Sequence, residues 1–173
     1  MEGLSKKLEA KNIDFKVKQL IKVGVKVKAL LLAYKDARVD MSILDEVAGV
    51  GNWQNDYKRD TKGVLQGGIA VKFGSEWVWK WSNGTESAME KEKGEYSDAF
   101  KRAGFMWGIG RHLYDFPNLF IDLKDDEYYD KQGKPTASNK LRPNDWNWFI
   151  DYEKGIIGAR DKKGDVRVNE KIK

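Results

Sequence analysis

The stretch from Lys93 to Tyr114, KGEYSDAFKRAGFMWGIGRHLY, constrains the fold of this chain more than any other. It has the spacing of a helix, and the second half of that helix is apolar on nearly all sides. Such a helix has to be buried against more than one neighbour, because no face of its second half suits water. One face of the predicted helix holds Tyr96, Phe100, Ala103, Trp107 and Tyr114.

Short polar residues and glycines add detail to this helix. Ser97 or Asp98 can cap its N-terminus, because a short oxygen-bearing side chain bonds the free N–H groups of the first turn. Gly104, Gly108 and Gly110 each cost a helix about 1 kcal/mol relative to alanine. We therefore expect another backbone to pass close to them.

A basic pair, Lys101 and Arg102, lies where the buried half of the helix begins. Two neighbouring cations on a helix are more often solvated surface charges than a binding site. The pair by itself therefore leaves both interpretations open.

Composition limits the classes of protein that fit. The chain has 173 residues, a formal net charge of +5, no cysteine and one histidine, which predicts a single domain over residues 1–173 and excludes disulfides and zinc sites built on His and Cys. It has no apolar run of membrane-spanning length and no signal-peptide core. We expect a soluble cytoplasmic protein. Basic clusters near both ends, with seven Trp and seven Tyr, favour a nucleic-acid partner, although a lysine-rich soluble protein would look similar.

Residues 15–28 alternate between apolar residues and lysine, which predicts one long strand or a hairpin near Gly24. A more fully buried segment then ends at Tyr34. The five lysines indicate a positive strip, although lysines also protect sheet edges. They are Lys16, Lys18, Lys22, Lys26 and Lys28.

Residues 40–88 predict a helix followed by an antiparallel meander. Asp40 can cap a helix that runs to about Ala48 and stops at glycine. Tight-turn pairs at 74–75 and 83–84 separate the strands of the meander over 53–88. Three tryptophans of this meander, at 77, 79 and 81, share one face. They could stack bases, but we favour a core position beneath the following helix.

The last third of the sequence is less regular. A short strand is predicted over 119–123, a flexible loop over 125–143, a final element over 145–160 and a charged tail over 161–173. The loop carries the acidic residues Asp122, Asp125, Asp126 and Glu127. These could bind magnesium, but a solvated acidic loop is the simpler interpretation.

Several kinds of chemistry have no support in the sequence. It has no phosphate-binding loop of the ATPase type, and its glycine-rich segment WGIGR does not lie between a strand and a helix start. A single histidine within an apolar helix cannot form a catalytic triad. We therefore expect a binding protein that is not an enzyme, with no catalytic residues, cofactor or metal.

Several segments together resemble one family. KGEYSDAFKRAGFMWGIGRHLYDFP resembles the signature helix of the Rad52 superfamily of single-strand annealing proteins, in the branch of phage Sak recombinases and DdrA-type repair proteins. AYKDARVDMSILDEVAGVGNWQ (33–54) is similar to the strand, helix and turn that precede it in the family, and LSKKLEAKNIDFKVK (4–18) to the N-terminal helix and first strand. IIGARD, near residue 160, is of the same kind.

This resemblance implies a fold and a function. The fold would be α+β, a twisted antiparallel sheet with a β-β-β-α core on a long central helix, assembled as a ring or filament of identical subunits. The protein would bind single-stranded DNA without ATP and anneal complementary strands in homologous recombination and DNA repair. DNA would lie in a basic groove with its bases free to pair. A single-strand-binding protein or an exonuclease could be a partner.

The resemblance also implies DNA-binding residues. The family's basic pair corresponds to Lys101 and Arg102, its first-strand cation to Lys16, with Lys18 beside it in the lysine strip, and a family aromatic residue to Tyr34.

Three further positions are less well matched. A family arginine one turn after the basic pair is replaced here by Phe105. Arg111 belongs to the phage-type signature, but we favour a structural role for it, in neutralising a buried carboxylate or capping the helix. Lys62 could contribute to a second, outer DNA site.

Two alternatives remain open. The protein could protect DNA ends with the same fold while annealing poorly. It could instead be a metal-dependent nuclease that uses the carboxylates of 122–127.

Overall fold

The structure, a computed structural model, describes residues 2–84 and 91–172. The chain forms two compact units, and each unit combines two separate segments of the sequence. The first unit consists of Met1–Leu8 and Lys35–Arg111, and the second of Glu9–Tyr34 and His112–Lys173. Within the described residues, no helix is long and apolar enough to cross a membrane.

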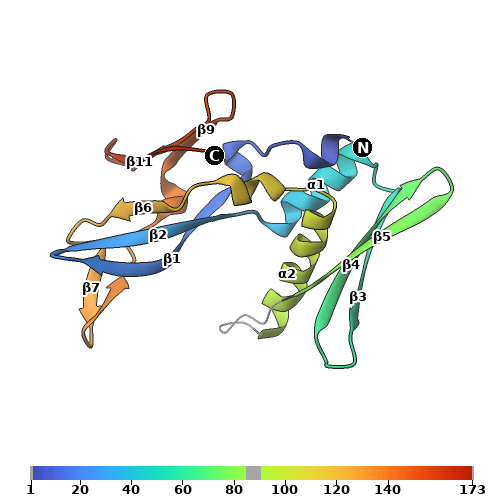
Figure 1. Ribbon diagram of the computed structural model, residues 1–173, viewed down its shortest axis with the longest axis horizontal. Coiled ribbons are helices and arrows are strands. Elements are labelled where there is room, and N and C mark those ends of the chain that lie inside the picture. Colours follow the sequence, from blue (N-terminus) through green and yellow to red (C-terminus); the bar gives the residue numbers. More distant parts are fainter. Residues whose placement is uncertain (1, 85–90, 173) are drawn as a thin grey trace. The chain divides into compact units, whose positions relative to one another are not determined.

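The first unit is a three-stranded sheet with a helix packed on one face (Figure 1). The strands β3 (Trp53–Arg59), β4 (Leu65–Phe73) and β5 (Glu76–Asn83) are antiparallel and adjacent in sequence order. The helix α2 (Lys91–Met106) packs on β4 and β5, and a shorter helix, α1 (Ala37–Val47), packs on α2. The 3-10 turn η1 (Glu2–Ser5) contacts α1. The meander and following helix have the predicted order, although the part of the predicted meander at 85–88 lies outside the described residues.

The core of this unit lies between the helices and the sheet. Its buried members come from η1, α1, β4, α2 and the segment after α2: Leu4, Leu44, Ile69, Val71, Phe100, Ala103, Trp107 and Ile109. The indole N–H of Trp107 donates to the Ile69 carbonyl oxygen at 3.0 Å. Within the predicted apolar face, burial is confirmed for Phe100, Ala103 and Trp107, whereas Tyr96 and Tyr114 are exposed.

The limits of α2 differ from the prediction. It begins at Lys91 rather than at Ser97 or Asp98, and it ends at Met106 rather than near Tyr114. Gly108 and Gly110 have φ angles of +97° and +71°, and this left-handed conformation ends a right-handed helix. A short 3-10 turn, η3 (Arg111–Asp115), follows.

The predicted cap of α1 was also wrong. Asp36 occupies the N-cap position and accepts a hydrogen bond from the Arg38 backbone N–H at 2.9 Å. Asp40 lies one turn inside the helix instead. It is fully buried there and forms an ion pair with Lys35. The predicted stop is confirmed, since Gly49 has a φ of +89° directly after the helix. The N-terminal helix implied by the resemblance of 4–18 is replaced by the short 3-10 turns η1 and η2 (Ala10–Asn12).

The second unit contains two three-stranded antiparallel sheets and a separate hairpin. One sheet has the order β1 (Asp14–Val23), β2 (Lys26–Tyr34) and β6 (Leu119–Asp122). The other pairs β10 (Ile156–Arg160) with β9 (Asn147–Asp151) and with β11 (Val166–Lys171). The hairpin at Gly24 and the strand near 119–123 are confirmed.

Two segments of this unit are more ordered than the sequence indicated. The expected loop at 125–143 contains the hairpin β7 (Tyr128–Lys131) and β8 (Lys134–Ala137) and ends at the 3-10 turn η4 (Pro143–Asp145). The expected tail at 161–173 contains β11. Neither segment was expected to form strands. Their residues are mostly polar and lack the regular apolar alternation that marks a half-buried strand. At the coarse level the α+β prediction is confirmed, with antiparallel sheets and two α-helices in the described residues.

Candidate nucleic-acid interface

The basic pair of α2 is half-buried rather than fully solvated. Arg102 lies one turn after Asp98, and its Nε donates to Asp98 Oδ2 at 2.8 Å. Lys101 lies close enough to the start of α1 to lower the pKa of Asp36, although the Arg38 backbone N–H has the larger effect. The pair is therefore held beside acidic groups, with its side chains partly accessible.

A fully buried ion pair lies next to Lys101. The Nζ of Lys35 donates to both carboxylate oxygens of Asp40 at 2.5 Å, and the side chains are 1% and 0% exposed. Burial raises the pKa of Asp40 to about 6, while the charges of Lys35 and Lys101 oppose this rise. Burial also lowers the pKa of Lys35, and Asp40 opposes that change. This pair was not predicted from the sequence, because its members lie five positions apart across a helix start.

Phe105 has a clear role in this environment. The Lys35 ammonium lies over the Phe105 ring, 4.5 Å from its centre. A cation over an aromatic face is stabilised by the ring quadrupole. Where the family has an arginine, this chain therefore has an aromatic cover for the buried lysine.

Arg111 caps the C-terminal end of α2. Its Nη2 donates to the carbonyl oxygens of Phe105 at 2.7 Å and Met106 at 3.3 Å. Lys80 donates to the same Met106 carbonyl at 2.9 Å. These last carbonyls carry the negative end of the helix dipole. The geometry supports the structural role for Arg111, and its DNA contact stays a prediction.

Lys62 is exposed in the turn between β3 and β4, where its backbone N–H donates to Asp60. Arg59, at the end of β3, reaches from this turn to Glu95 near the start of α2, with 3.0 Å between Nη2 and Oε2. Lys62 is therefore positioned near the opposite end of α2 from Arg111.

The other predicted site residues lie in the second unit. Lys16 and Tyr34 are brought together, because the Lys16 ammonium lies 5.1 Å from the centre of the Tyr34 ring. Lys18 is exposed in an irregular part of β1, where the register with β2 shifts between Val17 and Gln19. These residues and the basic pair of α2 belong to different units.

The predicted five-lysine strip was wrong. The bulge at Lys18 shifts the alternation of side chains, as an extra residue in a strand does. Lys22 pairs with Val27 and so lies on the opposite face from Lys16, which pairs with Leu32. Lys26 and Lys28 face Asp122 of β6, at 3.6 Å and 3.2 Å. This region is consequently less positive than the sequence pattern indicated.

The three in-phase tryptophans are not beneath α2, so their predicted core position was wrong. Residues of β4 and β5 that pair directly share a face, and Lys80, which reaches the end of α2, pairs with the core residue Ile69. The tryptophans pair instead with Lys72, Ala70 and Gly68, on the other face of the sheet. Trp77 is 38% exposed, and Trp79 and Trp81 are half-buried.

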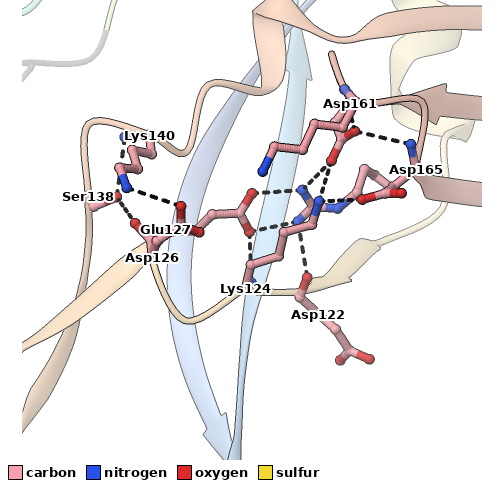
Figure 2. Close-up of polar contacts among 10 residues, drawn as sticks. Asp122, Lys124, Asp126, Glu127, Ser138, Lys140, Asp161 and Asp165 are labelled. Carbon is pink, nitrogen blue, oxygen red and sulfur yellow. Dashed lines mark hydrogen bonds and ion pairs between the residues drawn. The ribbon is translucent and has the colours of Figure 1, made fainter.

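Three of the four carboxylates considered for a metal site, Asp122, Asp126 and Glu127, are paired with cations of the protein. Figure 2 shows Glu127, Asp161 and Lys124 converging on one network of ion pairs. Arg167 forks onto both oxygens of Glu127 at 2.7 Å and 2.8 Å. Lys124 contacts Asp161 at 2.7 Å and holds the pKa of that carboxyl at about 2.

Asp126 and Asp122 are paired in the same way. Asp126 contacts Lys140 at 3.1 Å, and Asp122 contacts Lys26 and Lys28. A cleft of about 510 Å³ is lined by this network and by further lysines. In the described part of the chain, no group of three or more His, Cys, Asp or Glu side chains is arranged to hold a metal ion. The paired carboxylates therefore form ion pairs that stabilise the second unit.

Comparison with known proteins gives a match to one family. Residues 61–132 match the Rad52/22 family of double-strand break repair proteins. The matched segment makes up less than half of the chain. The resemblance predicted from the sequence is thereby confirmed. The matched segment holds β4, β5, α2 and β6, and with them Lys62, Lys101, Arg102 and Arg111, whereas Lys16, Lys18 and Tyr34 lie before it.

A relative supports the same family. Over 105 residues the chain is 31% identical to the single-stranded DNA-binding protein DdrA of Deinococcus radiodurans. This alignment covers 58% of the present chain and 48% of DdrA. The chain therefore spans about half the length of this relative.

Proposed function

We propose that this protein binds single-stranded DNA without ATP and anneals complementary strands during homologous recombination and DNA repair. The observation that carries the proposal is the Rad52/22 family segment, which encloses the basic pair of α2, together with the similarity to a single-stranded DNA-binding protein. The protein acts as a binder rather than an enzyme, and identical subunits assemble into a ring or filament around which the strand is held. A single-strand-binding protein or an exonuclease is a further partner class.

The mechanism follows from the electrostatics of DNA. Two strands repel each other until their phosphates are neutralised, and they pair only if their bases remain accessible. Lys101 and Arg102 offer partly accessible cations on a rigid helix. Lys16 offers another, oriented by the ring of Tyr34. Contacts of this kind hold the backbone without reading the sequence of the bases.

The first prediction tests this site with the double substitution Lys101→Ala and Arg102→Ala. We expect affinity for an oligo-dT strand to fall at least tenfold at moderate salt, because two phosphate contacts are lost. Fluorescence anisotropy measures the binding, and circular dichroism checks the fold. The matched control is Lys131→Ala with Lys134→Ala, which removes two exposed lysines from the β7–β8 hairpin. Unchanged binding and annealing by the first variant would refute the assignment.

A second function of the same fold is end protection without strong annealing. This alternative is favoured by the similarity to DdrA, which is named as a single-stranded DNA-binding protein. Annealing rate and simple binding should be compared on the same complementary oligonucleotides. Tight binding with an annealing rate no higher than that of free DNA would select this alternative.

A further inference from the structure

The sheet face opposite α2 carries an aromatic surface that the proposed phosphate contacts do not use. It consists of Trp77, Trp79 and Trp81 of β5, with Lys58 of β3 and Lys72 of β4 beside them; we call it the tryptophan face. The rings of Trp79 and Trp81 lie 5.2 Å apart and are tilted by only 19°. This nearly parallel pair of rings, with Trp77 on the same face of β5, presents extended π-surface.

The backbone beneath the rings is shaped to receive them. Trp81 lies directly over Gly68, and a Cβ added to Gly68 would come within 2.7 Å of the indole ring. Ala70, which pairs with Trp79, is fully buried. Small residues on β4 thus let the rings lie against the sheet. This geometry orders the indoles and keeps part of each one accessible.

Cations accompany the rings. The Lys58 ammonium lies over Trp81, 3.9 Å from the ring centre, and the Lys72 ammonium lies 5.9 Å from the centre of Trp77. Asp56 is the acidic neighbour on this face of β3, and its carboxylate accepts the Tyr57 backbone N–H at 2.8 Å. Lysines that alternate with aromatic rings match the two parts of a nucleotide, the phosphate and the base.

We propose that the tryptophan face is a base-stacking platform for unpaired nucleotides, in addition to the phosphate contacts of α2. This inference rests on the proposed binding of single-stranded DNA and extends it to a second surface. One to three bases stack on the indoles, while Lys58 and Lys72 turn toward the flanking phosphates. Stacking of this kind tolerates any base, because every base has a π-face.

The experiment compares two ligands of equal length and charge. One is a single-stranded oligonucleotide with all its bases, and the other has abasic sites throughout its central part. The variant is Trp77→Ala, which removes the most accessible ring, and Trp77→Phe is the conservative variant that still stacks. Tyr129→Ala, at a 50% exposed aromatic residue of β7, is the matched control. Circular dichroism confirms that each variant is folded.

We expect Trp77→Ala to weaken binding of the complete oligonucleotide about 5-fold or more, as loss of one stacked base does. Binding of the abasic strand, and the slope of affinity against salt, should stay unchanged. Trp77→Phe should recover most of the affinity. Equal weakening for both ligands, or no change for either, would overturn the inference.

Failure of the platform and failure of DNA binding as a whole give different results in these titrations. If wild-type protein binds neither oligonucleotide, the proposed function fails and the platform with it. If wild type binds both and Trp77→Ala alters neither, the platform alone fails. If Trp77→Ala lowers the subunit number in sedimentation and weakens both ligands alike, the face is a contact between copies of the chain, and the platform is again refuted.

Discussion

The buried pair of Lys35 and Asp40 dominates the chemistry of the molecule at the scale of single residues. It joins the start of α1 to α2, where Gly104 leaves room for the Asp40 carboxylate and Phe105 covers the Lys35 ammonium. Removing one member of such a pair leaves an unpaired buried charge, which costs about 3–5 kcal/mol. Lys101 lies beside the pair. Its positive charge therefore acts both at the proposed DNA site and on the buried pair at the start of α1.

This pair makes stability depend on pH. Burial raises the pKa of Asp40 from 3.8 to about 6 in the folded protein. The folded state then binds the proton more tightly than the unfolded state, so the contribution of Asp40 to stability is complete below pH 3.8 and is lost as the pH rises through about 6.

The test measures the free energy of unfolding in urea between pH 4 and 7, for wild type and for Lys35→Met with Asp40→Asn. The difference between the two proteins cancels the other carboxyl groups, including Asp161, whose lowered pKa acts in the opposite direction. We expect the wild type to lose stability relative to the variant as the pH rises. A constant difference across this range would contradict the assignment.

At the scale of elements, α2 packs closely on the β3–β5 meander because glycines at the contact have no side chains. A Cβ added to Gly67 would lie 2.8 Å from the backbone of Ala99, and one added to Gly84 would lie 2.9 Å from the Glu95 carbonyl oxygen. The backbone of α2 therefore approaches β4 closely at Gly67. Its companion Gly68 serves the other face, beneath Trp81.

Gly67→Ala should therefore destabilise the protein by about 1–3 kcal/mol, because the extra methyl group pushes α2 away from β4. The matched control is Gly51→Ala, since Gly51 has open space around its Cα and no left-handed φ. Urea denaturation followed by tryptophan fluorescence reports both. Equal stability of the two variants would show that α2 does not pack this closely on β4.

At the scale of the whole molecule, a net charge of +5 is small for a protein proposed to bind a polyanion. Several cations are already paired, including Lys35 with Asp40, Lys124 with Asp161 and Arg167 with Glu127. Binding of DNA would have to rely on a few accessible cations and on stacking, rather than on a general positive field.

The salt dependence of binding tests this balance. The logarithm of affinity should fall linearly with the logarithm of salt concentration, with a slope of about −0.7 for each phosphate contacted on a single strand. Lys101→Ala with Arg102→Ala should make the slope shallower by roughly one to one and a half, whereas Trp77→Ala should leave it unchanged. Titrations at several salt concentrations measure both slopes, and an unchanged slope in the basic-pair variant would place the phosphates elsewhere.

Much of the fold could be predicted from local patterns. Alternation revealed β1 and β2, glycine-containing turns marked the meander, and the apolar stretch after Lys101 showed a helix buried on its aromatic face. The candidate basic pair and the family followed from the motif around that helix. The hairpin at 128–137 escaped prediction because its strands are short and polar.

By itself, the sequence determined which residues alternate, where turns occur and which segment matches the Rad52/22 family. Tertiary structure alone decided which face of the meander is covered. A period of two separates Trp79 from Lys80 onto opposite faces, but either face could have met the helix. Packing against α2 selected the face of Ile69 and Val71, because Gly67 admits the helix backbone there, and it left the tryptophans on the other side. The helix that organised the sequence thereby determined which aromatic residues became core and which remained accessible.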